Sequence, residues 1–146
     1  MKLKVYTDWG SRWNPWLAWV WIYITDIHWK IYKKSYKDIW VKTCNEAEYL
    51  WAYYGIIEAI DLWAKTIYLF MDSDLVIKQL SWERKTRKDK LKDINIDIYK
   101  LIIKNEIKIF YNWIWREHNR VADRLVNIGL DTKQKELKKQ KELSRF

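Results

Sequence analysis

Hydrophobic and polar positions change their period along the chain, and these changes predict an order of strands and helices. Apolar and polar residues alternate over 2–8, as in a half-buried strand, and 17–25 and 30–36 read as two further strands joined by a turn at 26–29. From 45 to 62 the apolar residues recur every three to four positions, which is typical of an amphipathic helix. The pattern predicts an antiparallel meander followed by a helix.

The rest of the chain alternates between strand and helix patterns. In order, it predicts a buried strand over 66–71, a helix over 73–80, a helix over 88–104, a strand over 107–114 and a helix over 119–128. Asp72 or Ser73 could serve as the N-cap of the first of these helices. Three strands followed by alternating helices and strands imply an α/β fold, with a mixed five-stranded sheet flanked by helices.

Composition limits the class of protein. The 146 residues, of which 49% are hydrophobic, have room for one domain, expected over 1–129, and a charged tail over 130–146. The net charge of +9 favours polyanionic partners but would equally suit a membrane surface. No apolar run could span a bilayer, and the start of the chain lacks a signal peptide. One cysteine, Cys44, excludes an intrachain disulfide and suits a cytoplasmic location.

Four acidic residues lie far apart in four short phrases. Asp8 ends Val-Tyr-Thr-Asp, Glu48 lies in Thr-Cys-Asn-Glu-Ala-Glu-Tyr, Asp72 in Leu-Phe-Met-Asp-Ser, and Asp123 ends Arg-Glu-His-Asn-Arg-Val-Ala-Asp. Any one of them could be a helix cap or a solvated loop residue. Clustered carboxylates raise one another's pKa in the absence of cations, and Mg²⁺ prefers such hard oxygen ligands. If the fold brings the four together, metal binding is their expected purpose.

Taken together, the four phrases resemble the type 1 ribonuclease H family from near the start of the chain to about Gly129. The resemblance implies the ribonuclease H-like fold and a monomeric endoribonuclease that hydrolyses the RNA strand of RNA–DNA hybrids. It also implies two Mg²⁺ ions, with Mn²⁺ as an alternative. Asp8 would bridge both ions, Glu48 and Asp72 would hold the ion on the leaving-group side, and Asp123 the ion that activates water.

The same resemblance implies residues that contact the substrate. Asn45, one helical turn before Glu48, would bind a ribose 2′-OH or a base edge, Asn14 would contact the hybrid, and Thr43 a phosphate of the DNA strand. A turn or cap role explains the two asparagines equally well. His118 lies near a loop in which some members carry a histidine that assists proton transfer or product release, and a solvated loop residue is the competing interpretation.

The chain contains twelve tryptophans and only three glycines. The family's glycine-rich stretch after the first strand is broken here by tryptophans, and Trp29, Trp40, Trp63 and Trp82 also occupy positions where glycine would be natural. One hypothesis is that the gene reads UGA as glycine while this chain was translated with UGA as tryptophan. The alternative is an authentic aromatic surface for base stacking.

Two other functions are consistent with the same residues. A nuclease of the same fold could act on other RNA, because fold alone does not determine the substrate. A catalytically silent module could instead bind nucleic acid through basic and aromatic residues. The basic stretch 83–90 occupies the place of a substrate-gripping extension in some members, and either phosphate contact or plain solvation would explain it.

Overall fold

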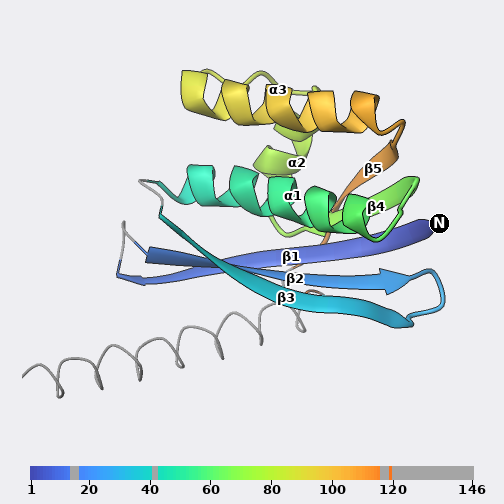
Figure 1. Ribbon diagram of the computed structural model, residues 1–146. Coiled ribbons are helices and arrows are strands. Elements are labelled where there is room, and N and C mark those ends of the chain that lie inside the picture. Colours follow the sequence, from blue (N-terminus) through green and yellow to red (C-terminus); the bar gives the residue numbers. More distant parts are fainter. Residues whose placement is uncertain (14–16, 41–42, 116–118, 120–146) are drawn as a thin grey trace, which may run out of the picture.

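A computed structural model describes residues 1–13, 17–40, 43–115 and 119 (Figure 1). The elements are, in order, β1 (Lys2–Trp13), β2 (Leu17–Asp26), β3 (Ile31–Trp40), α1 (Cys44–Asp61), β4 (Thr66–Met71), α2 (Asp74–Leu80), α3 (Asp89–Lys104) and β5 (Lys108–Trp113). Their types and order confirm the predicted α/β architecture. The helix expected over 119–128 and the tail over 130–146 lie outside the described residues except for Asn119, so the division at 129 stays a prediction.

Two strands extend beyond their predicted ends. β1 runs to Trp13 rather than to residue 8, and β3 runs to Trp40 rather than to residue 36. Both extensions pair with β2, through Trp13↔Leu17 and Leu17↔Trp40. Cross-strand hydrogen bonds therefore continue the strands through segments whose side-chain pattern no longer alternates.

The five strands form one mixed sheet in the order β3-β2-β1-β4-β5. β1 is antiparallel to β2, and β2 to β3, whereas β1, β4 and β5 run parallel to one another. The register of the central parallel pair runs from Lys2↔Thr66 to Tyr6↔Phe70. Because β1 and β4 are parallel, their carboxyl ends meet at the same edge of the sheet.

One face of the sheet is covered by helices (Figure 1). α1 packs on β1, β2 and β4, and α3 packs on the outer side of α1. The approach is close at Gly55, where a Cβ atom would lie 2.9 Å from Thr7 Cγ2 and 3.0 Å from Val5 Cγ1. Only a residue without a side chain fits there, so Gly55 fixes α1 directly against β1. None of the helices in the described residues is long and apolar enough to cross a membrane.

The other face of the central strands carries aromatic side chains. Val5 and Thr7 face α1, so Tyr6 between them points to the opposite side of the sheet. Its ring stacks on Phe70 of β4, with 4.7 Å between the ring centroids, and one strand further Tyr68 stacks on Phe110 at 5.2 Å. The central strands are therefore held together by side-chain contacts on both faces.

Candidate metal and nucleic-acid site

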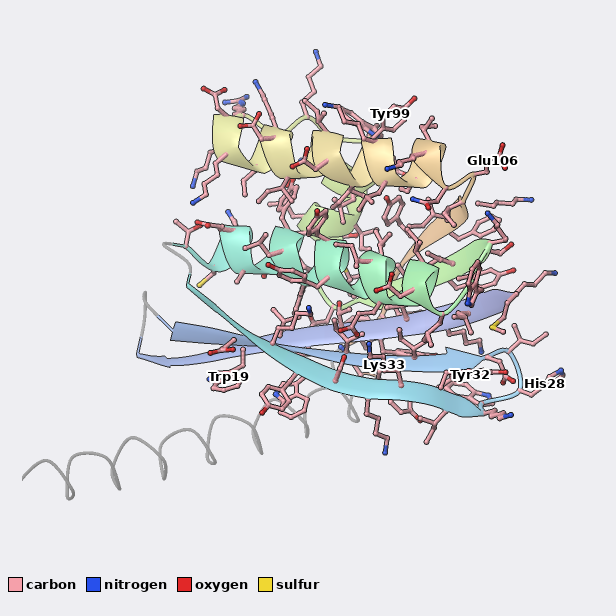
Figure 2. The ribbon with its side chains drawn as sticks, viewed as in Figure 1. Trp19, His28, Tyr32, Lys33, Tyr99 and Glu106 are labelled. Atoms are coloured by element: carbon pink, nitrogen blue, oxygen red, sulfur yellow. The ribbon has the colours of Figure 1, made fainter. Side chains whose placement is uncertain are left out.

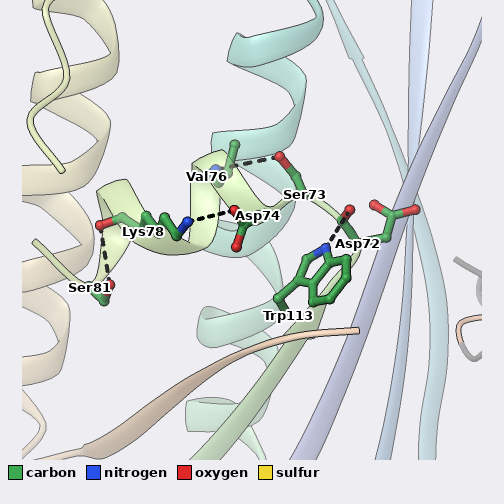
Figure 3. Close-up of polar contacts among 7 residues, drawn as sticks. All are labelled: Asp72, Ser73, Asp74, Val76, Lys78, Ser81 and Trp113. Atoms are coloured by element: carbon green, nitrogen blue, oxygen red, sulfur yellow. Dashed lines mark hydrogen bonds and ion pairs between the residues drawn. The ribbon is translucent and has the colours of Figure 1, made fainter. Parts of the chain in front are cut away.

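The parallel pairing of β1 and β4 places two of the predicted carboxylates at the same level. Asp8 follows Tyr6 by two residues and Asp72 follows Phe70 by two, and Tyr6 and Phe70 are register partners. Asp8 is only 2% exposed, while Asp72, just beyond the end of β4, is half-buried. In Figure 3 the Asp72 carboxylate points away from Trp113 and toward β1. Two acidic side chains distant in sequence thus lie at one edge of the sheet.

Glu48 joins this edge from α1. The Ser73 hydroxyl donates a hydrogen bond to Glu48 Oε2 over 3.3 Å, which links the first half of α1 to the residue that follows Asp72. The same hydroxyl oxygen is the N-cap of α2, accepting from the Val76 N–H over 3.4 Å (Figure 3). Ser73 is therefore the N-cap that the sequence left open between two candidates, and it also positions a predicted metal ligand.

The main chain at Asp72 is held from β5. Trp113 Nε1–H donates to the Asp72 carbonyl oxygen over 3.2 Å (Figure 3). One residue earlier, the Ile114 N–H donates to the Met71 carbonyl oxygen over 2.9 Å, so that backbone pairing of β4 and β5 continues to the end of β4. These contacts restrict the turn from which the Asp72 side chain projects.

Asn119, one residue of the fourth acidic phrase, lies against β1 beside Asp8. Its side chain is 2% exposed, and Nδ2–H donates to the carbonyl oxygen of Thr7, the residue before Asp8, over 2.9 Å. No role was predicted for this asparagine from the sequence, although it lies in the phrase that ends at Asp123. Asp123 lies four residues further along and is outside the described residues, as are Asn14 and His118.

The donor set suits a hard divalent cation. Asp8 in β1, Glu48 in α1 and Asp72 just after β4 offer carboxylate oxygens, which is the ligand type that Mg²⁺ and Mn²⁺ take. Among the described residues, no three acidic, histidine or cysteine side chains lie close enough to hold a metal ion by themselves. The set predicted for metal binding includes Asp123, so its assembly stays a prediction.

Thr43 and Asn45 begin α1 beside this edge. The Thr43 hydroxyl is the N-cap and accepts from the Glu46 N–H over 3.1 Å, so the residue predicted to touch a phosphate also has a structural task. Asn45 is half-buried and lines an open cavity of about 1080 Å³. The cavity's other lining residues include the basic side chains of Arg84, Lys85, Arg87, Lys88 and Lys92.

A buried polar network ties α1 to the segment that carries this basic cluster. The fully buried Tyr49 hydroxyl bonds to Gln79 Oε1 and lies 2.6 Å from Thr86 Oγ1. Burial raises the pKa of Tyr49, the bond to Thr86 lowers it, and the negative charge of Glu48 raises it further. Lys90 Nζ also contacts Glu46 Oε1 at 2.7 Å. The start of α3 is thus held against the start of α1, next to Glu48.

Comparison with known proteins gives relatives over most of the chain. The reverse transcriptase-like family model matches residues 32–129, which is more than half of the chain. The bifunctional protein Rv2228c of Mycobacterium tuberculosis is 33% identical over 135 residues, which cover 90% of this chain and 36% of that protein. The chain therefore spans about a third of the length of the curated relatives that it matches.

Solved structures agree in fold and in extent. The N-terminal ribonuclease H domain of Rv2228c, solved as a fusion with maltose-binding protein, is 29% identical with a TM-score of 0.81, covering 93% of this chain and 98% of that one. Ribonuclease H1 of the halophilic archaeon Halobacterium salinarum is 28% identical with a TM-score of 0.83, covering 90% and 99%. LC11 ribonuclease H1, solved with an RNA/DNA hybrid, is 27% identical with a TM-score of 0.81, covering 90% and 99%.

Proposed function

This chain belongs to the type 1 ribonuclease H family, and on that premise we propose that it is a metal-dependent endonuclease that hydrolyses the RNA strand of RNA–DNA hybrids. The observation that carries the proposal is the shared sheet edge at which Asp8 and Asp72 stand two residues beyond one register pair, with Glu48 attached through Ser73. If these acidic residues were only helix caps or solvated loop residues, they would not need to lie at one sheet edge or to be connected through Ser73.

The residues at this edge divide into ligands and supports. Asp8, Glu48 and Asp72, with Asp123, would hold two Mg²⁺ ions, and Mn²⁺ has the same preference for oxygen ligands. When bound, the ions supply an activated water and neutralise charge on the scissile phosphate. Ser73, the residue after Asp72, donates a hydrogen bond to Glu48, and Asn119 donates to the carbonyl of the residue before Asp8. Preorganised supports of this kind determine how well a metal site works.

The groups that would hold the substrate line the cavity that Asn45 reaches from the start of α1. Asn45 lines the cavity that also carries Arg84 and Arg87, so an amide able to meet a 2′-OH adjoins cations able to meet phosphates. LC11 ribonuclease H1 was solved with an RNA/DNA hybrid, and this chain shares its fold. Recognition of the hybrid here would combine the 2′-OH contact of Asn45 with phosphate contacts of the basic cluster.

The test is a cleavage assay with matched substrates. The purified chain is incubated with a labelled RNA–DNA hybrid, duplex RNA and single-stranded RNA, each with Mg²⁺ or EDTA, beside an Asp8→Asn variant. The proposal expects Mg²⁺-dependent cutting of the RNA strand of the hybrid alone, and no cutting by the variant. Cutting of duplex RNA would instead favour a same-fold nuclease with another substrate. A folded protein that binds the hybrid without cutting it would favour a silent binding module.

A further inference from the structure

Left-handed backbone conformations in this chain coincide with tryptophan. Among the residues that the structure describes, the non-glycine residues with positive φ are Trp29 at 67°, Trp63 at 67°, Trp82 at 65° and Glu106 at 54°. No glycine in the described part of the chain has positive φ. Side chains with a Cβ disfavour this region, and glycine is its usual occupant. Three of the four residues are thus of one bulky type that makes up only 12 of the 146 residues.

Trp63 occupies the glycine position of a helix-ending motif. α1 ends at Asp61 with Leu62 as its C-cap, and Trp63 follows. The Trp63 N–H donates to the Ile60 carbonyl over 2.9 Å and the Ala64 N–H to the Ala59 carbonyl over 3.0 Å. This pair of bonds is the Schellman motif, in which the residue after the C-cap is left-handed and most often glycine. The ring gains little here, because Trp63 is 83% exposed.

Trp82 follows α2 in a similar way. Ser81 is the C-cap, and the Trp82 N–H donates to the Gln79 carbonyl over 3.2 Å. Trp82 is 60% exposed. α3 provides an internal comparison, because Glu106, labelled in Figure 2, follows its C-cap Asn105. The Glu106 N–H donates to the Ile103 carbonyl and the Ile107 N–H to the Ile102 carbonyl, which are the two bonds of the Schellman motif.

Trp29 closes the β2–β3 hairpin. Its N–H donates to the Asp26 carbonyl over 3.2 Å, and the Asp26 N–H donates to the Lys30 carbonyl over 3.0 Å. The loop is therefore a turn followed by one left-handed residue, the position that glycine takes in three-residue hairpins. The Asp26 side chain completes the loop by accepting from the N–H groups of His28 and Lys30.

From these three positions we infer that the backbone is that of a protein with glycine at 29, 63 and 82, and that the gene encodes glycine there. In the cell of origin the codon UGA would be read as glycine, and the chain as written results from reading UGA as tryptophan. Two unlike structural contexts, helix ends and a hairpin, place tryptophan where the backbone favours glycine. One tryptophan in an unusual turn could be an isolated case. Tryptophan at three positions that favour glycine indicates a common cause.

An aromatic surface for base stacking does not account for Trp29 and Trp63, although Trp82 lines the cavity that also carries Asn45. Trp29 lies in the turn beside the start of β1, since Leu3 pairs with Asp26. Trp63 lies beside the same end, where the Lys65 N–H donates to the Met1 carbonyl. Asp8 and Asp72 lie toward the opposite end of the parallel strands. Rings at 29 and 63 therefore stand away from the edge that carries the acidic side chains.

The first test compares glycine with alanine at each of the three positions. Trp→Gly removes the ring and permits positive φ, whereas Trp→Ala removes the ring and keeps the backbone penalty. We expect each glycine variant to raise Tm by roughly 2–6 °C above the matched alanine variant, measured by thermal unfolding. Glu106→Gly against Glu106→Ala is a control for an ordinary residue in the same motif and should give a difference of the same sign.

Trp113→Gly tests the opposite expectation. Trp113 lies in strand β5, is 40% exposed and donates from Nε1 to the Asp72 carbonyl. Glycine there should lower Tm. Equal Tm values for the glycine and alanine variants at 29, 63 and 82 would overturn the inference, because the ring alone would then matter. UGG codons at these positions in the gene would also overturn it, whereas UGA codons and glycine-containing peptides from the source cell would establish it.

Discussion

The two ends of the parallel strands β1 and β4 differ in what they require of the sequence. The carboxyl end requires particular side chains. Asp8 and Asp72 each follow the register pair Tyr6↔Phe70 by two residues, and Ser73, next to Asp72, donates a hydrogen bond to Glu48. The amino end requires a particular backbone conformation, because Trp29 in a hairpin and Trp63 after a helix both have positive φ. The first end needs particular functional groups, and the second needs particular backbone freedom.

Substitutions at the two ends should therefore affect different measured quantities. Changing a carboxylate at the carboxyl end should alter cleavage while leaving the packing of the helices intact. Changing a residue at the amino end should alter the free energy of unfolding while leaving the catalytic groups in place.

Replacing Asp72 by Asn should abolish most cleavage. The substitution keeps the size of the side chain but removes the negative charge that a divalent cation needs. We expect the cleavage rate of the hybrid's RNA strand to fall by on the order of 10³-fold, equivalent to about 4 kcal/mol. The measurement is a single-turnover assay with Mg²⁺ in excess.

The control for Asp72→Asn lies at the other end of the strands. Trp29→Gly should cleave at the rate of the parent chain, because Trp29 is on the hairpin beside the start of β1. Equal losses in both variants, with both still folded, would contradict the proposed separation of the two ends.

Asn119→Ala should weaken metal binding without removing any proposed ligand. The buried amide that donates to the carbonyl of Thr7, the residue before Asp8, would be lost. Loss of a group that orients metal ligands typically costs about 10–100-fold in metal affinity or activity. A Mg²⁺ titration of the cleavage rate would show this as a higher half-saturating concentration.

A second asparagine provides the matched comparison. Asn112 of β5 is half-buried and its Nδ2–H donates to the Phe110 carbonyl over 3.2 Å, so Asn112→Ala also removes an amide-to-carbonyl bond. Asn112→Ala should leave the Mg²⁺ dependence unchanged. The positioning role of Asn119 would be wrong if both variants shifted the titration equally.

Two glutamates of α1 sharpen the contrast within one helix. Glu58, in the second half of α1, is 5% exposed, accepts a hydrogen bond from Ser35 Oγ over 2.5 Å and lies 3.8 Å from Lys33 Nζ. Glu58→Gln should lower the free energy of unfolding by about 1–2 kcal/mol, because a charge-assisted bond becomes a neutral one. Glu48→Gln should instead reduce cleavage.

Urea unfolding and the cleavage assay, applied to both variants, separate the two glutamates. The expected pattern is reduced stability with near-normal cleavage for Glu58→Gln and the reverse for Glu48→Gln. A loss of cleavage in Glu58→Gln at a urea concentration of zero would show that the far half of α1 also acts on the site.

Local patterns predicted the order of elements, whereas the four acidic residues were identified from their resemblance to a family, and their assembly into one metal site stays a prediction. Apolar periodicity is a local property, and it located β4 at residues 66–71 and α1 to within one residue at each end. That Asp8 and Asp72 share a level depends on the parallel pairing of β1 with β4, which no local pattern specifies. The contact of Asn119 with Thr7 spans 112 residues and was missed for the same reason.

The glycine positions divide in an instructive way. Trp29, Trp63 and Trp82 were expected where glycine is natural, and all three have positive φ, because helix ends and tight hairpins have recognisable sequence contexts. Trp40 was expected at such a position too, but it ends strand β3. Its segment was predicted to leave the sheet at residue 36, and pairing with β2 keeps it in the sheet instead.

The smallest predicted effect concerns Tyr6, which lies between the two ends. Burial, and to a lesser extent the neighbouring Tyr23, raises the pKa of Tyr6 from 10.0 to about 12. Because the folded state holds this proton more tightly than the unfolded state, the contribution to stability is complete below pH 10 and is lost as pH rises toward 12. Tyr6 is only partly buried, so the loss should be about 1 kcal/mol. Tyr6→Phe should therefore unfold in urea with a shallower decline between these pH values than the parent chain, and identical declines would show that other groups carry the alkaline sensitivity.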